Sequence, residues 1–200
     1  MIAIVDYGMG NLRSVQKALE RTGAAARIVA RPEEIDGADR LVLPGVGAMA
    51  DAMAALRTQQ LVEPIKRHLE RGRPFLGICL GFQMLFDISH EEGTHAGLGV
   101  FRGEVVPFAV PKPLKVPHMG WNAVHWRRRP PLAANLAPGA HFYFVHSYFV
   151  KPADPSIVAG ETDYGGPFCA AIWHEHIVAT QFHPEKSQGA GLALLERFAA

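Results

Sequence analysis

The segment at residues 77–83, with the sequence Gly-Ile-Cys-Leu-Gly-Phe-Gln, constrains the fold of this chain more than any other feature. The apolar run at 74–76 before it is typical of a buried strand, and the apolar run at 84–86 after it predicts the start of a helix. A Gly-x-Cys-x-Gly motif between a strand and a helix is the thiol form of a nucleophile elbow. Glycine is expected on both sides of Cys79 because a side chain there would crowd the backbone of so tight a turn.

The first half of the chain alternates between strand-like and helix-like patterns. The expected strands lie at residues 2–5, 26–30, 40–43 and 75–78, and the first of these is a continuous apolar run. The helical patterns lie at residues 11–21, 48–56 and 61–71. This alternation predicts a parallel sheet flanked by helices.

The second half has a different character. Short β-rich pieces separated by Pro and Gly occupy residues 98–124, and a long aromatic and β-branched stretch follows at 141–150. Residues 168–173 and 177–181 predict a hairpin, and residues 187–200 predict a closing helix. We therefore expect an α/β fold with a mostly parallel central sheet flanked by helices, and with antiparallel strands added in the second half.

The composition excludes several classes of protein. Two hundred residues, 48% of them apolar and 20% charged, suit one globular domain spanning residues 1–200. The net charge of +1 gives no electrostatic reason to expect nucleic acid as a partner. Two cysteines fit a reducing compartment, the N-terminus lacks a basic targeting region, and no apolar stretch approaches the ~18 residues of a membrane span. We therefore expect a cytoplasmic protein.

A nucleophilic thiol needs a base, and the segment at 181–185 (Gln-Phe-His-Pro-Glu) offers one. His183 follows a predicted strand, where α/β sheets carry their chemistry, and Glu185 is placed to fix its tautomer and stabilise its imidazolium form. The alternatives are ordinary, because a free Cys is usually a small buried hydrophobe and a His-Pro-Glu turn is common at a surface. The glycine bracket favours catalysis at Cys79, whereas Cys169 has no such setting and is expected in the core.

The Pro-Gly-Val-Gly segment at 44–47 ends another expected strand. A simple turn between a strand and a helix would explain its glycines. The functional alternative is a loop that offers backbone N–H groups to an oxyanion, because glycine permits the peptide orientation that such a donor requires. The N–H groups of Val46, Gly47 and Leu80, the last directly after the nucleophile, are therefore candidate oxyanion donors.

We expect no nucleotide cofactor and no metal. The Gly-Met-Gly segment at 8–10 slightly resembles a dinucleotide-binding fingerprint, but Arg13 stands where the last Gly of that fingerprint would fall. The ten His residues show no spacing with Cys or carboxylates that is typical of metal ligands.

Residues 77–83 and 183–185 together resemble the motifs of the class I, or triad, glutamine amidotransferases. Further segments resemble one branch of that family, the glutaminase subunits of imidazole glycerol phosphate synthase from histidine biosynthesis. These segments are DYGMGNLRS at 6–14, PGVG at 44–47, KVPHMGWN at 115–122 and YFVHSY at 143–148. The resemblance runs from the first residues to Gln188, with one small departure at Phe82, where Met is more usual. It implies the flavodoxin-like fold of the class I amidotransferases.

The resemblance also implies a reaction. The Cys79 thiolate would attack the side-chain amide of glutamine, and His183 would protonate the departing ammonia. Water activated by His183 would then release glutamate from the thioester. Gln83, Ser147 and Tyr148 match the positions that hold glutamine in the family. Without the resemblance, ordinary packing and surface polarity would be the preferred explanation for these three residues.

A partner is implied as well. The family partner is a (β/α)₈-barrel cyclase subunit, which forms a heterodimer and receives the ammonia through a tunnel. It uses the ammonia on a phosphoribulosyl-formimino aminoimidazole carboxamide nucleotide, giving imidazole glycerol phosphate and aminoimidazole carboxamide ribonucleotide. Met119, Trp121 and Asn122 would lie near that interface. The flexible glycines at 44–47 suggest that this loop is misoriented in the isolated subunit and turns when partner and ligand bind.

Three alternatives stay open at this point. The first is a triad amidotransferase that serves purine, anthranilate or pyridoxal phosphate synthesis, against which the segment at 115–122 argues. The second is a cysteine peptidase or esterase on the same elbow, against which Gln83 and the late His-Pro-Glu argue. The third is a non-catalytic subunit that has kept the fold, which the intact Cys79, His183 and Glu185 disfavour.

Overall fold

The computed structural model, which describes residues 1–200, contains a sheet whose first five neighbouring strands run parallel. In spatial order these strands are β2 (Ala26–Val29), β1 (Ile2–Val5), β3 (Arg40–Leu43), β4 (Phe75–Ile78) and β14 (Ile177–Thr180). Every residue of β1, β4 and β14 is buried, as expected of parallel strands covered on both faces. The four strands expected in the first half of the sequence are thus confirmed.

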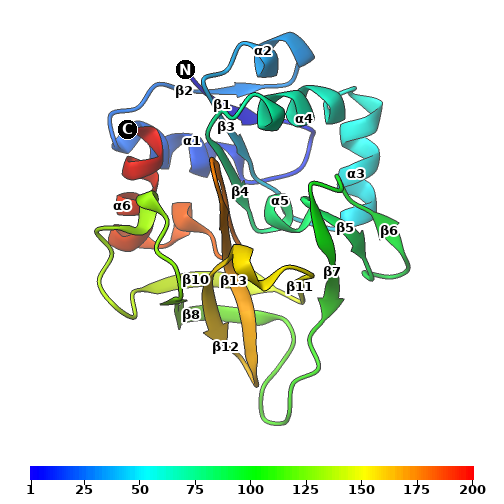
Figure 1. The fold of residues 1–200 in the computed structure, drawn as a ribbon, viewed down its shortest axis with the longest axis vertical. Helices are drawn as coiled ribbons and strands as arrows, with labels where there is room; N and C mark the ends of the chain where they lie inside the picture. Colours follow the sequence, from blue (N-terminus) through cyan, green and yellow to red (C-terminus); the bar gives the residue numbers. More distant parts are fainter.

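Helices cover both faces of this parallel half (Figure 1). Alternate residues of each strand point to opposite faces, so the sheet separates two hydrophobic cores. One core lies under α1 (Leu12–Arg21) and α6 (Gln188–Ala199). The other lies under α2 (Pro32–Asp36), α3 (Met49–Thr58) and α4 (Val62–Glu70), of which α2 was not expected from the sequence. None of the helices combines the length and the apolar character that crossing a membrane requires.

Beyond β14 the sheet continues mainly with antiparallel strands. Their order is β13 (Pro167–His174), β11 (Tyr148–Pro152), β7 (Phe101–Pro107), β5 (Phe86–Ser89) and β6 (His95–Ala96), with β12 (Val158–Asp163) paired to β13 and β9 (His125–Trp126) paired to β12. Only β5 and β7 run parallel here. The expected hairpin is confirmed as β13 and β14, and the expected α/β fold with added antiparallel strands is confirmed as well.

A separate antiparallel pair, β8 (His118–Ala123) and β10 (His141–His146), lies beside β12 at the end of the molecule opposite α2 (Figure 1). Three short 3₁₀ helices complete the chain, namely η1 (Pro131–Ala133), η2 (Pro155–Ile157) and η3 (Pro184–Lys186). The stretch at 141–150 is therefore not one strand, because Ser147 separates β10 from β11 and these belong to different sheets.

The expectation of a helix starting at 84–86 is wrong. The helix after the elbow is α5 (Leu80–Gln83), a single turn that begins directly after Cys79. The Met84 and Leu85 carbonyls accept hydrogen bonds from the N–H groups of Leu98 and Val100, at 2.7 and 2.9 Å, and β5 begins at Phe86. Bonds to a segment distant in sequence therefore outweigh the local apolar pattern, which by itself does not distinguish a helix from a strand.

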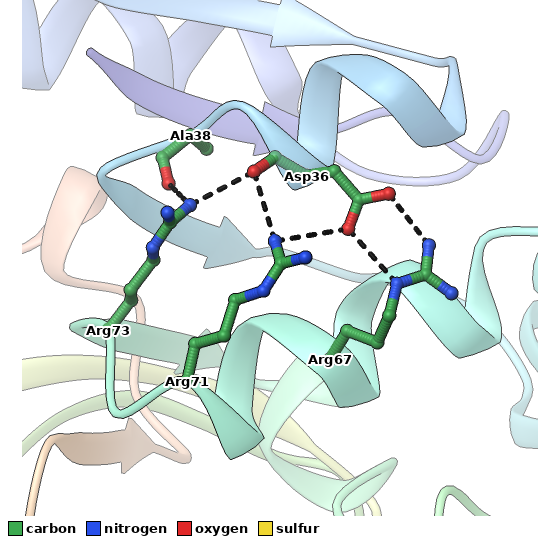
Figure 2. A network of polar contacts seen from close by, with 5 residues as sticks. All are labelled: Asp36, Ala38, Arg67, Arg71 and Arg73. Carbon is green, nitrogen blue, oxygen red and sulfur yellow. Dashed lines mark hydrogen bonds and ion pairs between the residues drawn. The ribbon is translucent and has the colours of Figure 1, made fainter.

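Three arginines, one in α4 and two directly after it, fasten the end of α2, as Figure 2 shows. Arg67 donates to both carboxylate oxygens of Asp36, at 3.1 and 2.7 Å. Arg71 donates to the backbone carbonyl and the carboxylate of Asp36, and Arg73 donates to the carbonyls of Asp36 and Ala38. These bonds satisfy carbonyl groups that the end of a short helix leaves without partners.

Replacing Asp36 with alanine is expected to lower the unfolding temperature by a few degrees at pH 7. The effect is limited because Arg67 and Arg71 are almost half exposed. The hydrogen bond from Arg67 lowers the pKa of Asp36, so this stabilisation is present above the usual carboxyl pKa and is lost as pH falls through the lowered value. Calorimetry should therefore show the difference at pH 7 shrinking at acid pH. Glu33→Ala, on the same helix, is the control, and an equal loss there would contradict the prediction.

Candidate active site

The carboxyl ends of three neighbouring parallel strands meet at the candidate site. β3 leads into the loop at 44–47, β4 leads into Cys79, and β14 leads into the segment that carries His183. The backbone N–H of Cys79 donates to the Thr180 carbonyl at 2.8 Å, which extends the pairing of β4 with β14 by one residue. This edge is where open α/β sheets bind their ligands, and the strand order brings together residues that are far apart in sequence.

The backbone of Cys79 is strained. Its φ is 54° and its ψ is −108°, a combination that residues with a side chain rarely adopt. The surroundings explain both neighbouring glycines. A Cβ on Gly81 would overlap the carbonyl of Leu43, and a Cβ on Gly77 would lie 3.0 Å from the Cβ of Ala179. The expectation that side chains at these two positions would crowd the turn is confirmed.

His183 and Glu185 form a buried pair. Their side chains are only 2% and 1% exposed, and Nδ1 of His183 lies 2.8 Å from Oε1 of Glu185. Because a carboxylate accepts, Nδ1 carries a proton. Nε2 of His183 is buried without a hydrogen-bond partner, and His183 lines the same cavity as Cys79. The arrangement leaves one ring nitrogen free to exchange a proton with a group in that cavity.

The backbone of His183 is also held in place. Its N–H donates to the Tyr143 carbonyl at 2.9 Å, and its carbonyl accepts from the Ser187 hydroxyl at 2.6 Å. The same hydroxyl accepts from the Tyr143 N–H at 2.9 Å. The backbone of His183 is therefore fixed to both β10 and the start of α6, which limits the positions that its imidazole can take.

Burial lowers the pKa of His183, but the negative charge of Cys79 and the contact with Glu185 more than offset this and raise the pKa to about 10. The imidazole is therefore protonated near neutral pH when Cys79 is a thiolate. In this form the sulfur is a strong nucleophile and the histidine is ready to give a proton to a leaving group. The helix α5 has one turn, so its dipole supports the thiolate less than a long helix would.

Replacing Cys79 with alanine is expected to lower the pKa of His183, because the negative charge of the sulfur, which raises that pKa, is removed. Burial, which lowers the pKa, is then opposed mainly by the contact with Glu185. A pH titration of the imidazole signals by NMR measures the shift. Cys169→Ala is the matched control, since that thiol is buried elsewhere in the sheet and should leave the titration unchanged. The same His183 pKa in the Cys79→Ala protein and the wild type would contradict the role given to the sulfur.

The loop at 44–47 packs against the elbow. A Cβ on Gly45 would lie 2.9 Å from the Cβ of Leu80 and would overlap the hydroxyl of Tyr7. That hydroxyl donates to the Pro44 carbonyl at 3.0 Å. Burial raises the pKa of Tyr7, and the charge of Cys79 adds to the effect, so the phenol stays neutral and keeps its donor. Tyr7 thus ties the loop to the end of β1.

The three residues that carry the candidate oxyanion donors lie in one cavity. Val46, Gly47 and Leu80 line one cavity with Cys79. Gly47 has a φ of 92°, a left-handed conformation that favours glycine. The loop therefore lies where an oxyanion donor is needed, beside the turn that carries the thiol.

The cavity has a volume of about 590 Å³, which is enough for an amino acid. Gln83, Ser147 and Tyr148, the residues expected to hold glutamine, line it together with Cys79 and His183. Ser147 occupies the break between β10 and β11, so this wall of the cavity is formed where the two sheets separate.

Sequence reasoning missed other residues of the cavity. Glu91 and Glu92 line it, and the Glu91 carboxylate accepts from the Met49 N–H at the start of α3, at 2.7 Å. Gln181 also contacts the nucleophile, with its Nε2 3.6 Å from Sγ of Cys79. The acidic pair gives no distinctive pattern in sequence, but the position of Gln181, two residues before His183, could have drawn attention to it.

The residues expected at a partner interface lie on β8. Met119 and Trp121 are 62% and 47% exposed and project from the same face of the strand. Asn122 projects from the other face, where its Nδ2 donates to the Asp163 carbonyl at 2.9 Å. β8 thus presents two large apolar side chains on one face and a half-buried amide on the other.

Comparison with known proteins identifies the class. The family model described as glutamine amidotransferase class-I matches residues 3–200, and the chain belongs to that family. Solved structures with the same fold include a glutamine amidotransferase, with a TM-score of 0.76 and 19% identity over 100% of both chains. PurLQS from Thermotoga maritima has a TM-score of 0.77 and 18% identity over 98% of this chain and 96% of that chain. At these identities the likeness concerns the fold alone.

Curated relatives narrow the assignment within the family. The imidazole glycerol phosphate synthase subunit HisH of Rhodopirellula baltica is 59% identical, covering 100% of this chain and 97% of the relative. The HisH of Syntrophotalea carbinolica is 54% identical over 99% and 98%, and that of Aquifex aeolicus is 51% identical over 98% and 94%. The chain is a HisH-type glutamine amidotransferase, as the motifs at 115–122 and 143–148 indicated.

Proposed function

We propose that this chain is the glutaminase subunit of an imidazole glycerol phosphate synthase and supplies ammonia for histidine biosynthesis. The observation that carries the proposal is the buried His183–Glu185 pair, with Nε2 of the histidine free, in one cavity with a strained Cys79. The names of the relatives support the choice of this synthase over other amidotransferases.

The reaction has two halves. The Cys79 thiolate attacks the side-chain amide carbon of glutamine, and the carbonyl oxygen becomes an oxyanion. The N–H groups of Val46, Gly47 and Leu80 stabilise it, and losing one such donor typically costs about 10²–10³ in rate. His183 passes the proton on Nε2 to the amide nitrogen, the C–N bond breaks, and ammonia leaves a glutamyl thioester.

Hydrolysis of the thioester restores the site. Neutral His183 takes a proton from water at Nε2, and the resulting hydroxide attacks the thioester carbon. The C–S bond breaks, which releases glutamate and regenerates the Cys79 thiolate beside the imidazolium. Throughout both halves, Glu185 accepts from Nδ1 and stabilises the positive charge on the ring.

Recognition of glutamine rests on other residues that line the cavity. Gln83, Ser147 and Tyr148 surround the substrate, and the carboxylates of Glu91 and Glu92 suit its α-ammonium group. An acidic rim of this kind favours a free amino acid over an internal residue of a peptide, which carries no ammonium group. This argues against the cysteine peptidase alternative.

The ammonia is then used by a partner. We propose a heterodimer with a (β/α)₈-barrel cyclase, which receives the ammonia through a tunnel and forms imidazole glycerol phosphate and aminoimidazole carboxamide ribonucleotide. Met119 and Trp121 support an interface on β8, because large exposed apolar side chains on a strand are typical of surfaces that a partner covers.

The test is glutamate release from glutamine, measured for the chain alone, with the cyclase, and with the cyclase and its nucleotide ligand. Strong release only in the full mixture, lost in Cys79→Ala, is the expected result. Equal release by the isolated chain would contradict the proposal that the 44–47 loop turns on assembly. No release in any mixture would overturn the assignment to this synthase and favour either a different synthase partner or a non-catalytic subunit.

A further inference from the structure

Two buried histidines outside the proposed catalytic triad face each other across β8 and β10. His118 and His146 are directly opposite in the strand register, and Nδ1 of His118 lies 3.1 Å from Nε2 of His146. Both are almost fully buried, at 3% and 6% exposure. A buried polar ring costs free energy unless its nitrogens are satisfied, so the partners of these nitrogens show what the pair does.

The hydrogen bonds determine which ring nitrogen of each histidine carries a proton. Nδ1 of His146 lies 2.8 Å from the Tyr148 carbonyl, which can only accept, so Nδ1 carries the proton and Nε2 accepts from Nδ1 of His118. Nε2 of His118 then accepts from the Asn122 amide at 3.3 Å. Burial lowers the pKa of His118 to about 4 and that of His146 to about 3, so both rings are neutral near pH 7, as this pattern requires.

The chain of bonds continues to the nucleophile. The Tyr148 carbonyl also accepts from Nε2 of Gln83 at 3.0 Å, and the same Nε2 donates to Oε1 of Gln181 at 3.0 Å. Nε2 of Gln181 lies 3.6 Å from Sγ of Cys79. Both amide hydrogens of Gln83 are thus used inside the protein, which leaves its Oε1 to accept a hydrogen bond from a ligand in the cavity.

We propose that His146 and His118 are positioning residues for the glutamine site. Together they hold the Tyr148 carbonyl in place. Through the bonds of that carbonyl to Gln83, and of Gln83 to Gln181, they also hold the part of the cavity wall that lies between the glutamine site and the Cys79 thiol. This inference rests on the proposed function and deepens it.

The hydrogen bonds of the pair also involve β8, the strand that carries the expected interface. Asn122, at the other end of the hydrogen-bond chain, lies on β8 next to Trp121. The geometry of the glutamine wall therefore depends on the position of β8, through bonds rather than through packing alone.

Simple filling of the core is the competing explanation, because the rings of Phe108, Phe144 and Phe168 surround the pair. A phenylalanine would fill the same space without a polar cost. Four variants separate the two explanations. His146→Phe keeps the ring and removes both bonds, whereas His146→Asn places an amide nitrogen near the former Nδ1. His118→Phe removes the donor to His146 and the acceptor for Asn122 but leaves the bond from His146 to Tyr148, and Phe108→Leu disturbs the packing without removing any hydrogen bond.

The experiment measures alkylation of Cys79 in the complex with the cyclase and its nucleotide, together with KM and kcat for glutamine hydrolysis. One reagent is a glutamine analogue with a diazoketone in place of the amide, and the other is iodoacetamide, which needs no glutamine pocket. We expect His146→Phe to lower the preference for the analogue, and kcat/KM, about tenfold, mainly through KM. His118→Phe should lose less, and His146→Asn and Phe108→Leu should stay within about threefold of the wild type.

Wild-type preference in His146→Phe would overturn the positioning role, as would an equal loss in Phe108→Leu. If the wild type itself shows no preference for the analogue, the proposed glutaminase function fails and this inference fails with it, so the two failures are distinguishable. NMR of the imidazole nitrogens gives a readout on the wild type that does not depend on any variant folding. Both rings should be neutral with the proton on Nδ1, and an Nε2–H tautomer of either ring would also overturn the proposal.

Discussion

Cys79→Ala is expected to reduce glutamine hydrolysis by the assembled synthase about 10⁴-fold or more, because no other group on the cavity wall can form the thioester. Glutamine should still bind, since the residues that surround it are untouched. The cyclase reaction should continue when ammonium salts replace glutamine. Glutamate release and ammonia-dependent cyclase activity, measured on the same preparation, check both expectations.

Cys169→Ala is the matched control for this prediction. Burial raises the pKa of the Cys169 thiol, which donates weakly to the Ala171 carbonyl at 3.6 Å, so it is an inert core residue. Its replacement should leave glutaminase activity unchanged. A fall comparable to that of Cys79→Ala would show that loss of a buried side chain, and not loss of the nucleophile, explains the result.

His183→Asn is expected to lower the glutaminase rate about 10⁴-fold or more, as Cys79→Ala does. The asparagine amide can still donate to Glu185 and so keeps that buried carboxylate paired, but the nitrogen that exchanges protons is lost. Without the imidazolium, the Cys79 thiolate also loses its positive neighbour. Alkylation of Cys79 by iodoacetamide at pH 7 should therefore slow as well, because the thiolate is the form that reacts.

Glu185→Gln distinguishes two roles of Glu185, namely holding the His183 ring in position and stabilising its positive charge. Glutamine can accept from Nδ1 through its oxygen, so His183 remains in place, but the negative charge that stabilises the imidazolium is gone. We expect a large loss of rate with little change in KM, and a lower pKa of His183 by NMR. Near-wild-type rates in both His183→Asn and Glu185→Gln would remove the basis for a catalytic triad.

The sequence predicts those features of the structure that depend on contacts within a short segment of the chain. The bracket of Gly77 and Gly81 follows from the crowding of one tight turn, and the burial pattern of β1 and β4 follows from their continuous apolar runs. The strained turn at Cys79 and the position of His183 in the same cavity are therefore consistent with what the amino-acid sequence alone predicts. The resemblance to a known family supplied the roles of Gln83, Ser147 and Tyr148, which no local pattern indicates.

What the sequence did not predict depends on contacts between distant segments. The run at 84–86 is apolar enough for a helix or a strand, and its bonds to residues 98–101 decide the outcome. The break at Ser147 exists because the flanking strands pair with β8 and β7 in different sheets. The neutral proton pattern of His118 and His146 arises only when their strands lie side by side, so neither residue stood out among ten histidines.

The position of β14 beside β4 has a consequence for how the enzyme is made. Gln181 and Cys79 are 102 residues apart in sequence, and His183 lies further along still. During synthesis Cys79 emerges from the ribosome long before His183, its proposed base, and the sheet is completed only when β14 inserts between β4 and β13. Such long-range pairing forms late in folding. Under the proposed mechanism, a nascent or half-folded chain therefore cannot hydrolyse glutamine, and ammonia release begins only when the sheet is complete.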